Sequence, residues 1–386
     1  MTPVLYRGSV KDVLGPVALA SGGSAALFKF SDAFSVFDWG RMPDAIEGKG
    51  QALAILAADF LGRVAQPQTW KEFSRTGEAY DLRNGVARLP AATDGPVPLG
   101  AAPQASVGAI FNELGEKLQT QGLRTHLLGV VSDAGAAKAD GGGKVEPVGL
   151  DRVKEPPKHI AVRPVNVVPP AVQKVMGRSV RDYGTTRSAP LPRLIPLEVV
   201  FRFSAPPGSS LPARAAAHPE YAAQLAIPQD VKTEGGRRIE DRRGPRDRVR
   251  EGDRWAFPVI ELFTKLEPTD RPVTVGEALA ITGLSAHQIQ NLMLLTAWVA
   301  GFVRYRCRIA GLELADGKLE WALDADGELL LVDAIGPDEL RILRGGTQLS
   351  KEFLRRFYRA SPWASRVSEA KKHAAARGLP DWKKGV

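Results

Sequence analysis

The sequence predicts a protein of the α+β class, because three kinds of pattern occur along one chain. Apolar and polar residues alternate over 5–14 and 25–38, on either side of a Gly-rich turn, as they do in β-strands. Apolar residues recur at helical spacing over 50–64. The dipeptide 326–327, Asp-Gly, separates two strand-like runs and is a strong hairpin signal. Both helices and antiparallel strands are therefore expected.

Further elements are expected along the rest of the chain. Residues 107–118 have helical spacing, and residues 194–203 are typical of a strand. Capping-box patterns begin at Thr274 and Ser285, and the second opens a long helix with an apolar stripe. Residues 349–378 predict a basic terminal helix.

Loops and insertions are expected between these elements. Residues 65–105 are polar and rich in Pro and Gly, which predicts an inserted surface segment, and residues 133–144 are rich in Gly and Ala. Eleven of the 29 prolines fall within 156–212, so this stretch is expected to be mostly loop apart from its one strand. Residues 234–254 form a second polar insertion.

Composition restricts the class of protein further. The chain has 386 residues and a formal charge of +9, with one cysteine, Cys307, which excludes a disulfide framework and a Cys-rich metal site. No secretory signal follows Arg7 and Lys11, and the longest apolar stretch, 292–303, is shorter than the ~20 residues that span a bilayer. The expectation is a soluble cytoplasmic protein.

The positive charge admits nucleic acid or phosphorylated small molecules as partners. Eight arginines gather in 234–254, but six acids interrupt them and no aromatic residue occurs there, which favours a self-neutralising loop over a nucleic-acid surface. The basic C-terminal residues 351–386 are compatible with a solvated helix face, an anionic partner or an oligomer contact.

The most informative segment is the predicted hairpin 316–333. If 326–327 is a two-residue turn, Glu320 lies directly opposite Asp333, and Asp316 and Lys318 share the face of Glu320. Two carboxylates at such a short separation repel each other unless a shared proton, the nearby lysine or a divalent cation lies between them. Oxygen ligands of this kind suit Mg²⁺. A one-residue bulge would break this register, and a solvated hairpin with ordinary surface charges is the alternative.

Two further features carry less specific chemistry. The turn Arg7-Gly8-Ser9-Val10-Lys11 could offer backbone N–H groups and an ammonium to a phosphate, or it could be a plain β-turn. Lys265 follows an apolar run, 259–263, and is ambiguous by itself.

Taken in order, these segments resemble the SAICAR synthetase (phosphoribosylaminoimidazole-succinocarboxamide synthase) family of purine biosynthesis. Seven segments carry the resemblance through most of the chain: 5–13, 31–38, 46–50, 122–126, 196–209, 318–341 and 349–355. The resemblance implies a two-layer, ATP-grasp-like α+β architecture with a nucleotide-binding lobe, 1–205, and a C-terminal lobe, 206–386. Insertions are expected at about 65–105 and 133–190 in the first lobe and at 234–254 in the second.

The resemblance also implies an ATP- and Mg²⁺-dependent ligase. In this family ATP phosphorylates a carboxylate, and the amine of aspartate attacks the acyl phosphate to give an amide, ADP and phosphate. The implied partners are therefore small carboxylate and amine substrates, one of them a phosphorylated nucleotide precursor. Neither a membrane nor a nucleic acid is expected as a partner. A homo-oligomer is possible.

Individual residues take roles by the same resemblance. Glu320 and Asp333 would hold Mg²⁺, and Lys318 would lie near the nucleotide. Lys11 and Lys265 would neutralise phosphate charge. The remaining implied residues are the catalytic Asp338, the nucleotide-binding Arg7, Gly8 and Ser9, the substrate-binding Asp38, Ser209, Asp270, Arg271 and Arg341, and Arg202, which takes both catalytic and substrate-binding roles.

This chain departs from the family pattern near the substrate. Asp270-Arg271 stands where the family has His-Asp, Ser9 replaces a basic residue, and Ala334 replaces an acid. These changes leave three interpretations: a divergent SAICAR synthetase, a paralogue that joins a different acid and amine, or a non-catalytic nucleotide-binding module.

Overall fold

The computed structural model describes every residue except 1, 37–38, 90–105, 226, 228–229, 233–237, 241–248, 378–382 and 384–386. The chain divides into two compact units, each built from separated segments. Unit 1 comprises 1–59, 127–163 and 335–386, and unit 2 comprises 60–126 and 164–334. The predicted lobes, 1–205 and 206–386, are each one continuous segment and so differ from these units. The division into lobes stays a prediction. No helix among the described residues is long and apolar enough to cross a membrane.

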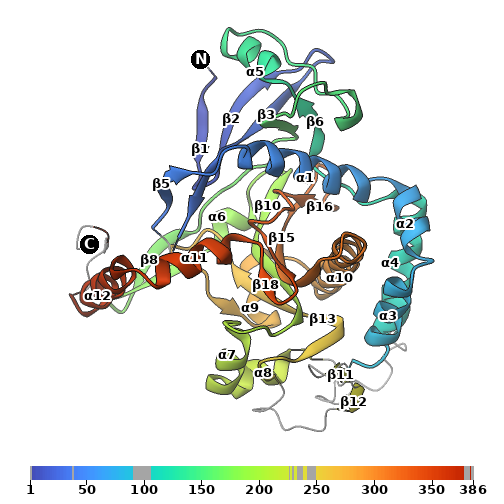
Figure 1. Ribbon diagram of the computed structural model, residues 1–386, viewed down its shortest axis with the longest axis vertical. Helices are drawn as coiled ribbons and strands as arrows, with labels where there is room; N and C mark the ends of the chain where they lie inside the picture. Colours follow the sequence, from blue (N-terminus) through green and yellow to red (C-terminus); the bar gives the residue numbers. More distant parts are fainter. Residues whose placement is uncertain are drawn as a thin grey trace. The chain divides into compact units, whose positions relative to one another are not determined.

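A five-stranded antiparallel sheet forms the centre of unit 1 (Figure 1). Its strands, in spatial order, are β1 (Val4–Arg7), β2 (Lys11–Ala18), β3 (Ser24–Phe30), β7 (His159–Val162) and β6 (Leu127–Val131). The expected N-terminal strands are therefore confirmed. Val17, Leu27 and Ala161 lie in the apolar cluster that this sheet buries.

The other elements of unit 1 are helices and short strands. They are β4 (Ala33–Ser35), β5 (Arg41–Ala45), α1 (Lys49–Val64, which continues into unit 2), α5 (Asp133–Asp140), η1 (Leu150–Arg152), β17 (Leu340–Arg344), β18 (Thr347–Gln348), α11 (Lys351–Arg359) and α12 (Pro362–Arg377). The Asp32 carboxylate anchors the start of α1 by accepting a hydrogen bond from the Gly50 amide at 2.8 Å, which lowers the pKa of Asp32. The predicted terminal helix is interrupted at residues 360–361.

A second antiparallel sheet forms the centre of unit 2. Its main strands run in the order β12 (Arg238–Glu240), β11 (Asp230–Lys232), β13 (Arg254–Thr264), β10 (Arg193–Ser204) and β15 (Glu313–Leu323), with β14 (Pro272–Val273) beside β13 and β16 (Leu329–Val332) beside β15. Leu197, Val199 and Phe201 alternate along β10 and are completely buried on one face. The long helix α10 (Ala286–Ile309) packs against β10, β13 and β15 (Figure 1), and Trp321 Nε1 donates to Thr296 Oγ1 at 3.0 Å.

The remaining helices of unit 2 surround α10 and the sheet. They are α2 (Pro67–Phe73), α3 (Gly77–Val86), α4 (Val107–Gln121), α6 (Gly184–Arg187), α7 (Leu211–Ala217), α8 (Pro219–Gln224) and α9 (Val275–Thr282). Both capping boxes, at Thr274 and Ser285, are confirmed. The expectation of a surface segment over 65–105 was wrong for α2 and α3, because Trp70 and Leu82 are buried there.

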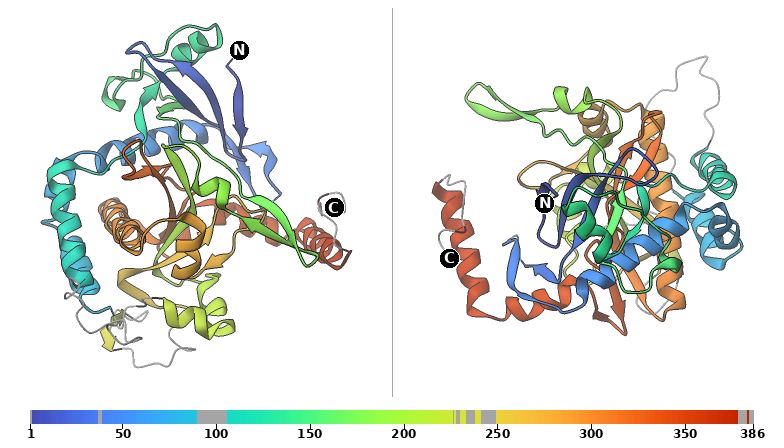
Figure 2. Two further views of the ribbon diagram at one scale, coloured as in Figure 1. Left: turned by 180° about the vertical axis from the view of Figure 1, so that it is seen from behind. Right: turned by 90° about the horizontal axis from the view of Figure 1, so that it is seen from above.

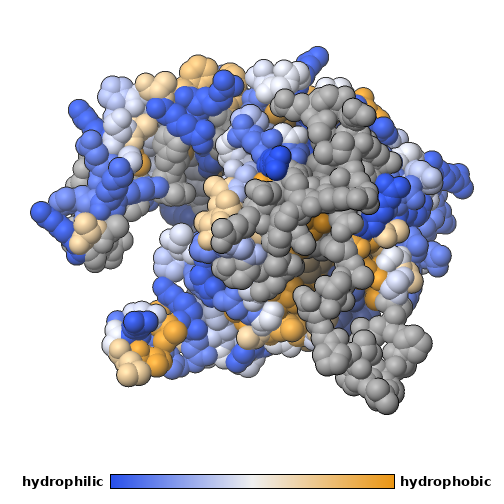
Figure 3. All heavy atoms as spheres, turned by 90° about the horizontal axis from the view of Figure 1, so that it is seen from below, coloured by the Kyte–Doolittle hydropathy of each residue, from blue (hydrophilic) through white to orange (hydrophobic). Residues whose placement is uncertain are grey.

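One hairpin of unit 2 projects into solvent (Figure 2). It consists of β8 (Ala171–Val175) and β9 (Arg178–Asp182), which pair along their whole length. Every residue of β8 is exposed, and Figure 3 shows apolar side chains gathered on the hairpin. Met176, at its tip, is 98% exposed. This hairpin and α6 occupy part of the stretch that was expected to be mostly loop.

The hairpin β15–β16 corrects the predicted register by one residue. Glu320 pairs with Val332 rather than with Asp333, and Leu323 pairs with Leu329. The connection is longer than two residues, because the Asp324 amide donates to Glu328 and the Gly327 amide donates to Asp324. Gly327, with a φ of 79°, supplies the left-handed position of a bulged hairpin loop. The direct opposition of Glu320 and Asp333 was therefore wrong.

Candidate functional site

The charged residues of the two motif-bearing strands lie on one face of the unit 2 sheet. Glu198 of β10 pairs directly with Glu320 of β15, and Val200 pairs with Lys318. Alternation along each strand therefore gives Glu198, Lys318 and Glu320 a common face, opposite the one that α10 covers. Backbone pairing also places Lys265 here, because its amide donates to the carbonyl of Pro196 at 3.0 Å.

Two lysines converge on the Glu198 carboxylate. Lys265 Nζ donates to Glu198 Oε1 at 2.8 Å and to Glu320 Oε1 at 2.7 Å. Lys318 Nζ donates to the same oxygen of Glu198 at 2.6 Å. The ammonium of Lys265 therefore bonds both carboxylates of a directly paired Glu–Glu position and offsets their repulsion. We call these four residues the lysine–glutamate cluster.

The cluster is only partly open to solvent, which strengthens its electrostatics. Burial alone would raise the pKa of Glu198, but the ammonium groups of Lys318 and Lys265 outweigh burial and lower that pKa. Burial would likewise lower the pKa of Lys265, but the Glu320 and Glu198 carboxylates outweigh it and raise that pKa. The Glu198 carboxylate and the Lys265 ammonium are therefore both charged at neutral pH.

The predicted residues Asp270 and Arg271 follow β13 and have different surroundings. Partial burial of the Asp270 carboxyl, and then the negative charge of Glu198, raise the pKa of Asp270, which places it beside the cluster. Arg271 instead donates to Glu277 Oε1 at 3.1 Å, and its Nε lies 3.6 Å from Glu267 Oε2. The structure thus brings Asp270 to the cluster, whereas Arg271 is paired with Glu277 and Glu267.

Arg202 lies in a buried ionic network farther along β10. Its Nε donates to Glu261 Oε2 at 2.5 Å, and its Nη1 donates to Asp316 Oδ2 at 3.1 Å. Glu261 is completely buried, and its other oxygen accepts hydrogen bonds from Arg214 and, at 2.9 Å, from the Tyr221 hydroxyl. The predicted substrate-binding arginine is therefore held by two carboxylates, and its side chain is 8% exposed.

The backbone conformations at Ser209 and Asp333 were not predicted from the sequence. The Ser209 amide closes a turn with the Pro206 carbonyl at 2.9 Å, and its buried hydroxyl has no hydrogen-bond partner among the described residues. Asp333 follows β16 in a left-handed conformation with a φ of 66°. The carbonyl oxygen of Asp333 lies 3.0 Å from His126 Nε2, so this strained residue is fixed by a side chain of unit 2.

The predicted phosphate turn lies in unit 1 between β1 and β2. The Gly8 amide donates to the Lys11 carbonyl at 3.0 Å, and a Cβ atom at Gly8 would lie 2.4 Å from that carbonyl oxygen. Glycine is therefore required at this turn. Lys11 Nζ lies 4.9 Å from the centre of the Phe28 ring. Arg7 and Ser9 flank Gly8 in the same turn, and their phosphate role stays a prediction.

Asp338 and Arg341 also lie in unit 1. The Asp338 carboxylate accepts a hydrogen bond from Lys49 Nζ at 2.8 Å, and Lys49 donates to the Ala33 carbonyl at 3.0 Å. Arg341 lies on β17. Asp38 and most of the Arg-rich insertion lie outside the described residues, so their predicted roles stay predictions.

Three charged residues with direct partners at these sites were missed by the sequence reasoning: Glu198, Glu261 and Lys49. A detectable signal existed for Glu198, because a carboxylate interrupts an otherwise apolar strand on the same side as Arg202. Glu261 carries the same signal in β13. Lys49 begins a helix, and nothing in its local sequence indicates a distant carboxylate partner.

A magnesium site would need few protein ligands beside a nucleotide. Among the residues that the structure describes, no three His, Cys, Asp or Glu side chains are grouped as metal ligands. Mg²⁺ at phosphate sites commonly takes only one or two carboxylates together with phosphate oxygens and water. The second oxygen of Glu320, Oε2, has no hydrogen-bond partner among the described residues and suits this role.

Comparison with known proteins gives consistent relatives. The family model described as SAICAR synthetase matches residues 185–370. A protein of Archaeoglobus fulgidus, provisionally named phosphoribosylaminoimidazole-succinocarboxamide synthase, is 30% identical over 98% of this chain and 85% of its own length. A Thermoplasma acidophilum synthase of the same name is 33% identical over 34% of this chain and 46% of its own. A solved structure of SAICAR synthetase (Type-2) in complex with ADP is 17% identical to this chain and has a TM-score of 0.48. The match covers 93% of this chain and 92% of the solved chain.

The family model and the Archaeoglobus relative define the class of the protein as a ligase that forms a carbon–nitrogen bond with ATP. Within that class, the extent and identity of the Archaeoglobus match show that the chain belongs to the SAICAR synthetase family.

Proposed function

We propose that this protein joins a carboxylate-bearing phosphoribosylaminoimidazole to the amine of aspartate, which gives the succinocarboxamide product that the names of its relatives contain. The observation that carries the proposal is the lysine–glutamate cluster on the sheet face opposite α10. Phosphoryl transfer depends mainly on positioned positive charge around the phosphates, and this face supplies two ammonium groups within a partly buried setting.

The cluster has unused donors for phosphate oxygens. One ammonium hydrogen of Lys265 and two of Lys318 have no acceptor among the described residues, because the hydrogen bonds to Glu198 and Glu320 use the others. Glu198 therefore aligns both lysines without exhausting them. Glu320 and Asp333 are the residues that would hold Mg²⁺, which when bound neutralises phosphate charge.

The proposed chemistry has two balanced steps. A carboxylate oxygen of the substrate attacks the terminal phosphorus of ATP, so that an acyl phosphate forms and ADP leaves. The amine then attacks the acyl carbon, the amide bond forms, and phosphate leaves while the amine loses a proton. Lys265 and Lys318 stabilise the phosphoryl charge in the first step. The substrate-binding role of Ser209 stays a prediction, because its hydroxyl is buried.

A second candidate function concerns the amine. Asp270 adds a further carboxyl beside the cluster, which is unfavourable for a dicarboxylic amino acid, and Arg271 is already paired with Glu277 and Glu267. This arrangement favours a paralogue that keeps the ATP chemistry and accepts a less acidic amine.

Measuring ADP release separates these functions. The protein is mixed with ATP, Mg²⁺ and the carboxyaminoimidazole ribotide, with aspartate or with a neutral amino acid as the amine. ADP release that requires aspartate supports the proposed reaction, and release that requires another amine selects the paralogue. Calorimetric ATP binding without ADP release for any acid–amine pair would instead define a non-catalytic nucleotide-binding module.

A further inference from the structure

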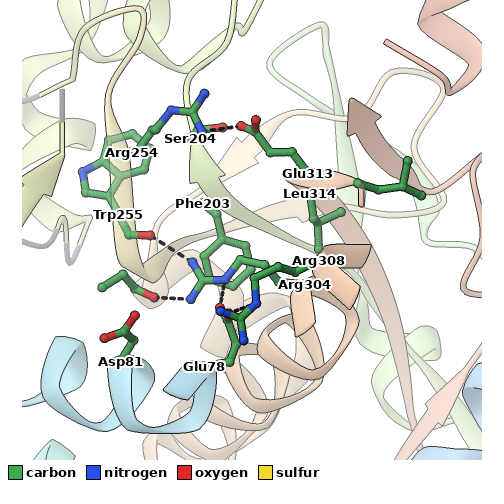
Figure 4. A pocket seen from close by; sticks show the side chains of 12 residues that line it. Glu78, Asp81, Phe203, Ser204, Arg254, Trp255, Arg304, Arg308, Glu313 and Leu314 are labelled. Atoms are coloured by element: carbon green, nitrogen blue, oxygen red, sulfur yellow. Dashed lines mark hydrogen bonds and ion pairs between the residues drawn. The ribbon is translucent and has the colours of Figure 1, made fainter. Parts of the chain in front are cut away.

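A pocket separate from the lysine–glutamate cluster lies at the other end of the same strands in unit 2. Its volume is about 360 Å³, and it is lined by the ends of β10, β13 and β15 and by helices α3 and α10 (Figure 4). Phe203 in its lining lies five residues beyond Glu198 along β10, which corresponds to about 17 Å of strand. No residue of the cluster lines it.

One charged residue of the lining, Arg304, is already bonded to other residues of the pocket. The Arg304 guanidinium lies 3.6 Å from the centre of the Phe203 ring and donates to Glu78. It also donates to the carbonyl oxygens of Trp255 at 3.1 Å and Ala256 at 2.8 Å. Arg304 therefore ties α10 to α3 and β13 and has little capacity for a ligand.

The opposite rim is closed by an ion pair. Arg254 Nη1 lies 2.6 Å from Glu313 Oε1, and the two side chains are 47% and 37% exposed. Figure 4 shows this pair on one side of the pocket and the group around Arg304 on the other. Both walls are therefore polar and electrically balanced.

Four polar groups of the lining have no hydrogen bond among the described residues, and one of them is the buried Trp255 Nε1. The Asp81 carboxylate has no hydrogen bond among the described residues, and Figure 4 shows it apart from the bonded groups. Arg308 likewise has no hydrogen bond among the described residues, and its Nε lies 3.6 Å from Glu78 Oε2. The Ser204 hydroxyl is buried without a hydrogen-bond partner in the part of the chain that the structure describes, and Ser204 is 6% exposed.

The carboxylate of Asp81 and the guanidinium of Arg308 carry opposite charges, which restricts the class of ligand. A purely anionic ligand would meet Glu78, Asp81 and Glu313. A purely cationic ligand would meet three arginines. A zwitterion satisfies both signs, and the volume is near the lower end of the ~300–1,000 Å³ found for small-molecule sites. Asp81 and Arg308 both line the pocket, so their two charges face a common space.

We propose that this pocket binds a free α-amino acid as a second site, distinct from the proposed catalytic face. The ammonium of the amino acid pairs with Asp81, and its carboxylate pairs with Arg308. Phe203 and Leu314 provide the apolar surface for its side chain.

Calorimetry of the full chain with each of the common amino acids tests the proposal. We expect at least one amino acid to bind with a Kd below about 10 mM, and Asp81→Asn and Arg308→Gln each to weaken that binding by about tenfold or more. Arg306→Gln, on the same helix but outside the pocket lining, should leave it unchanged. Circular dichroism verifies that each variant folds.

Two results would overturn the proposal. One is that no amino acid binds more tightly than about 10 mM. The other is that binding persists in both pocket variants, which would assign it to the catalytic face or to another surface. The outcome is independent of the proposed reaction, because the binding assay contains neither ATP nor a carboxylate substrate.

Discussion

Replacing Lys265 with methionine should lower kcat by about 10²–10³, because the variant removes a positioned ammonium from the phosphoryl-transfer site. The neutral side chain also leaves Glu198 and Glu320 as directly paired carboxylates with no cation bonded to both. Lys318 can still donate to Glu198, so the cluster loses alignment rather than all of its charge. The measurement is ADP release at saturating ATP and substrates.

A surface lysine of the same unit provides the matched control. Lys117 is 58% exposed and lies 3.9 Å from Glu328, so Lys117→Met should leave turnover unchanged. Lys265→Met turnover within a factor of about three of the wild type would remove Lys265 from the phosphoryl-transfer step. An intact circular dichroism spectrum for Lys265→Met would exclude unfolding as the cause of lost activity.

Replacing Glu261 with glutamine should lower the free energy of unfolding by about 3–5 kcal/mol, as expected when one partner of a buried ionic network is removed. The carboxylate is completely buried and accepts hydrogen bonds from Arg202, Arg214 and Tyr221. Glutamine keeps the shape of the side chain, so the loss reports charge rather than a cavity. Urea denaturation gives the free energy directly.

The exposed pair of unit 2 again supplies a control. Glu328→Gln removes a carboxylate that is 55% exposed and should change stability by no more than about 1 kcal/mol. Equal effects of the two substitutions would show that the Arg202–Glu261 network adds no more than a surface pair.

The stability difference at Glu261 should also depend on pH. Burial would raise the pKa of Glu261, but Arg202 and Arg214 outweigh burial and lower it. A lowered folded-state pKa gives stability that is present above the unfolded-state pKa, ~4.3, and lost as pH falls through the folded-state value. The difference between wild type and Glu261→Gln should therefore shrink in acid.

Local patterns predicted much of the fold because their signals are short in range. The two capping boxes involve residues three apart, and the strand 194–203 carries its own alternation. The turn around Gly327 was also recognised, but its loop type was wrong, and one extra residue moved Asp333 out of register with Glu320. A local signal therefore gave the hairpin and not its register.

The site needed contacts that the local sequence does not specify. Glu198 and Lys318 are 120 positions apart, and Lys265 reaches Glu198 only because β10 pairs with both β13 and β15. Family resemblance supplied the lysines, whereas strand order supplied the carboxylate that aligns them. The same reasoning explains Arg202, which the sequence marked as charged without showing that Glu261 would bury it.

In the proposed reaction a substrate carboxylate receives the phosphoryl group of ATP. Substrate labelled with oxygen-18 in that carboxylate tests this step, with the released phosphate and the amide product analysed by mass spectrometry. We expect each phosphate released to carry one labelled oxygen from the substrate. ADP formation accompanied by unlabelled phosphate would exclude this step, because water or another acceptor would then have received the phosphoryl group.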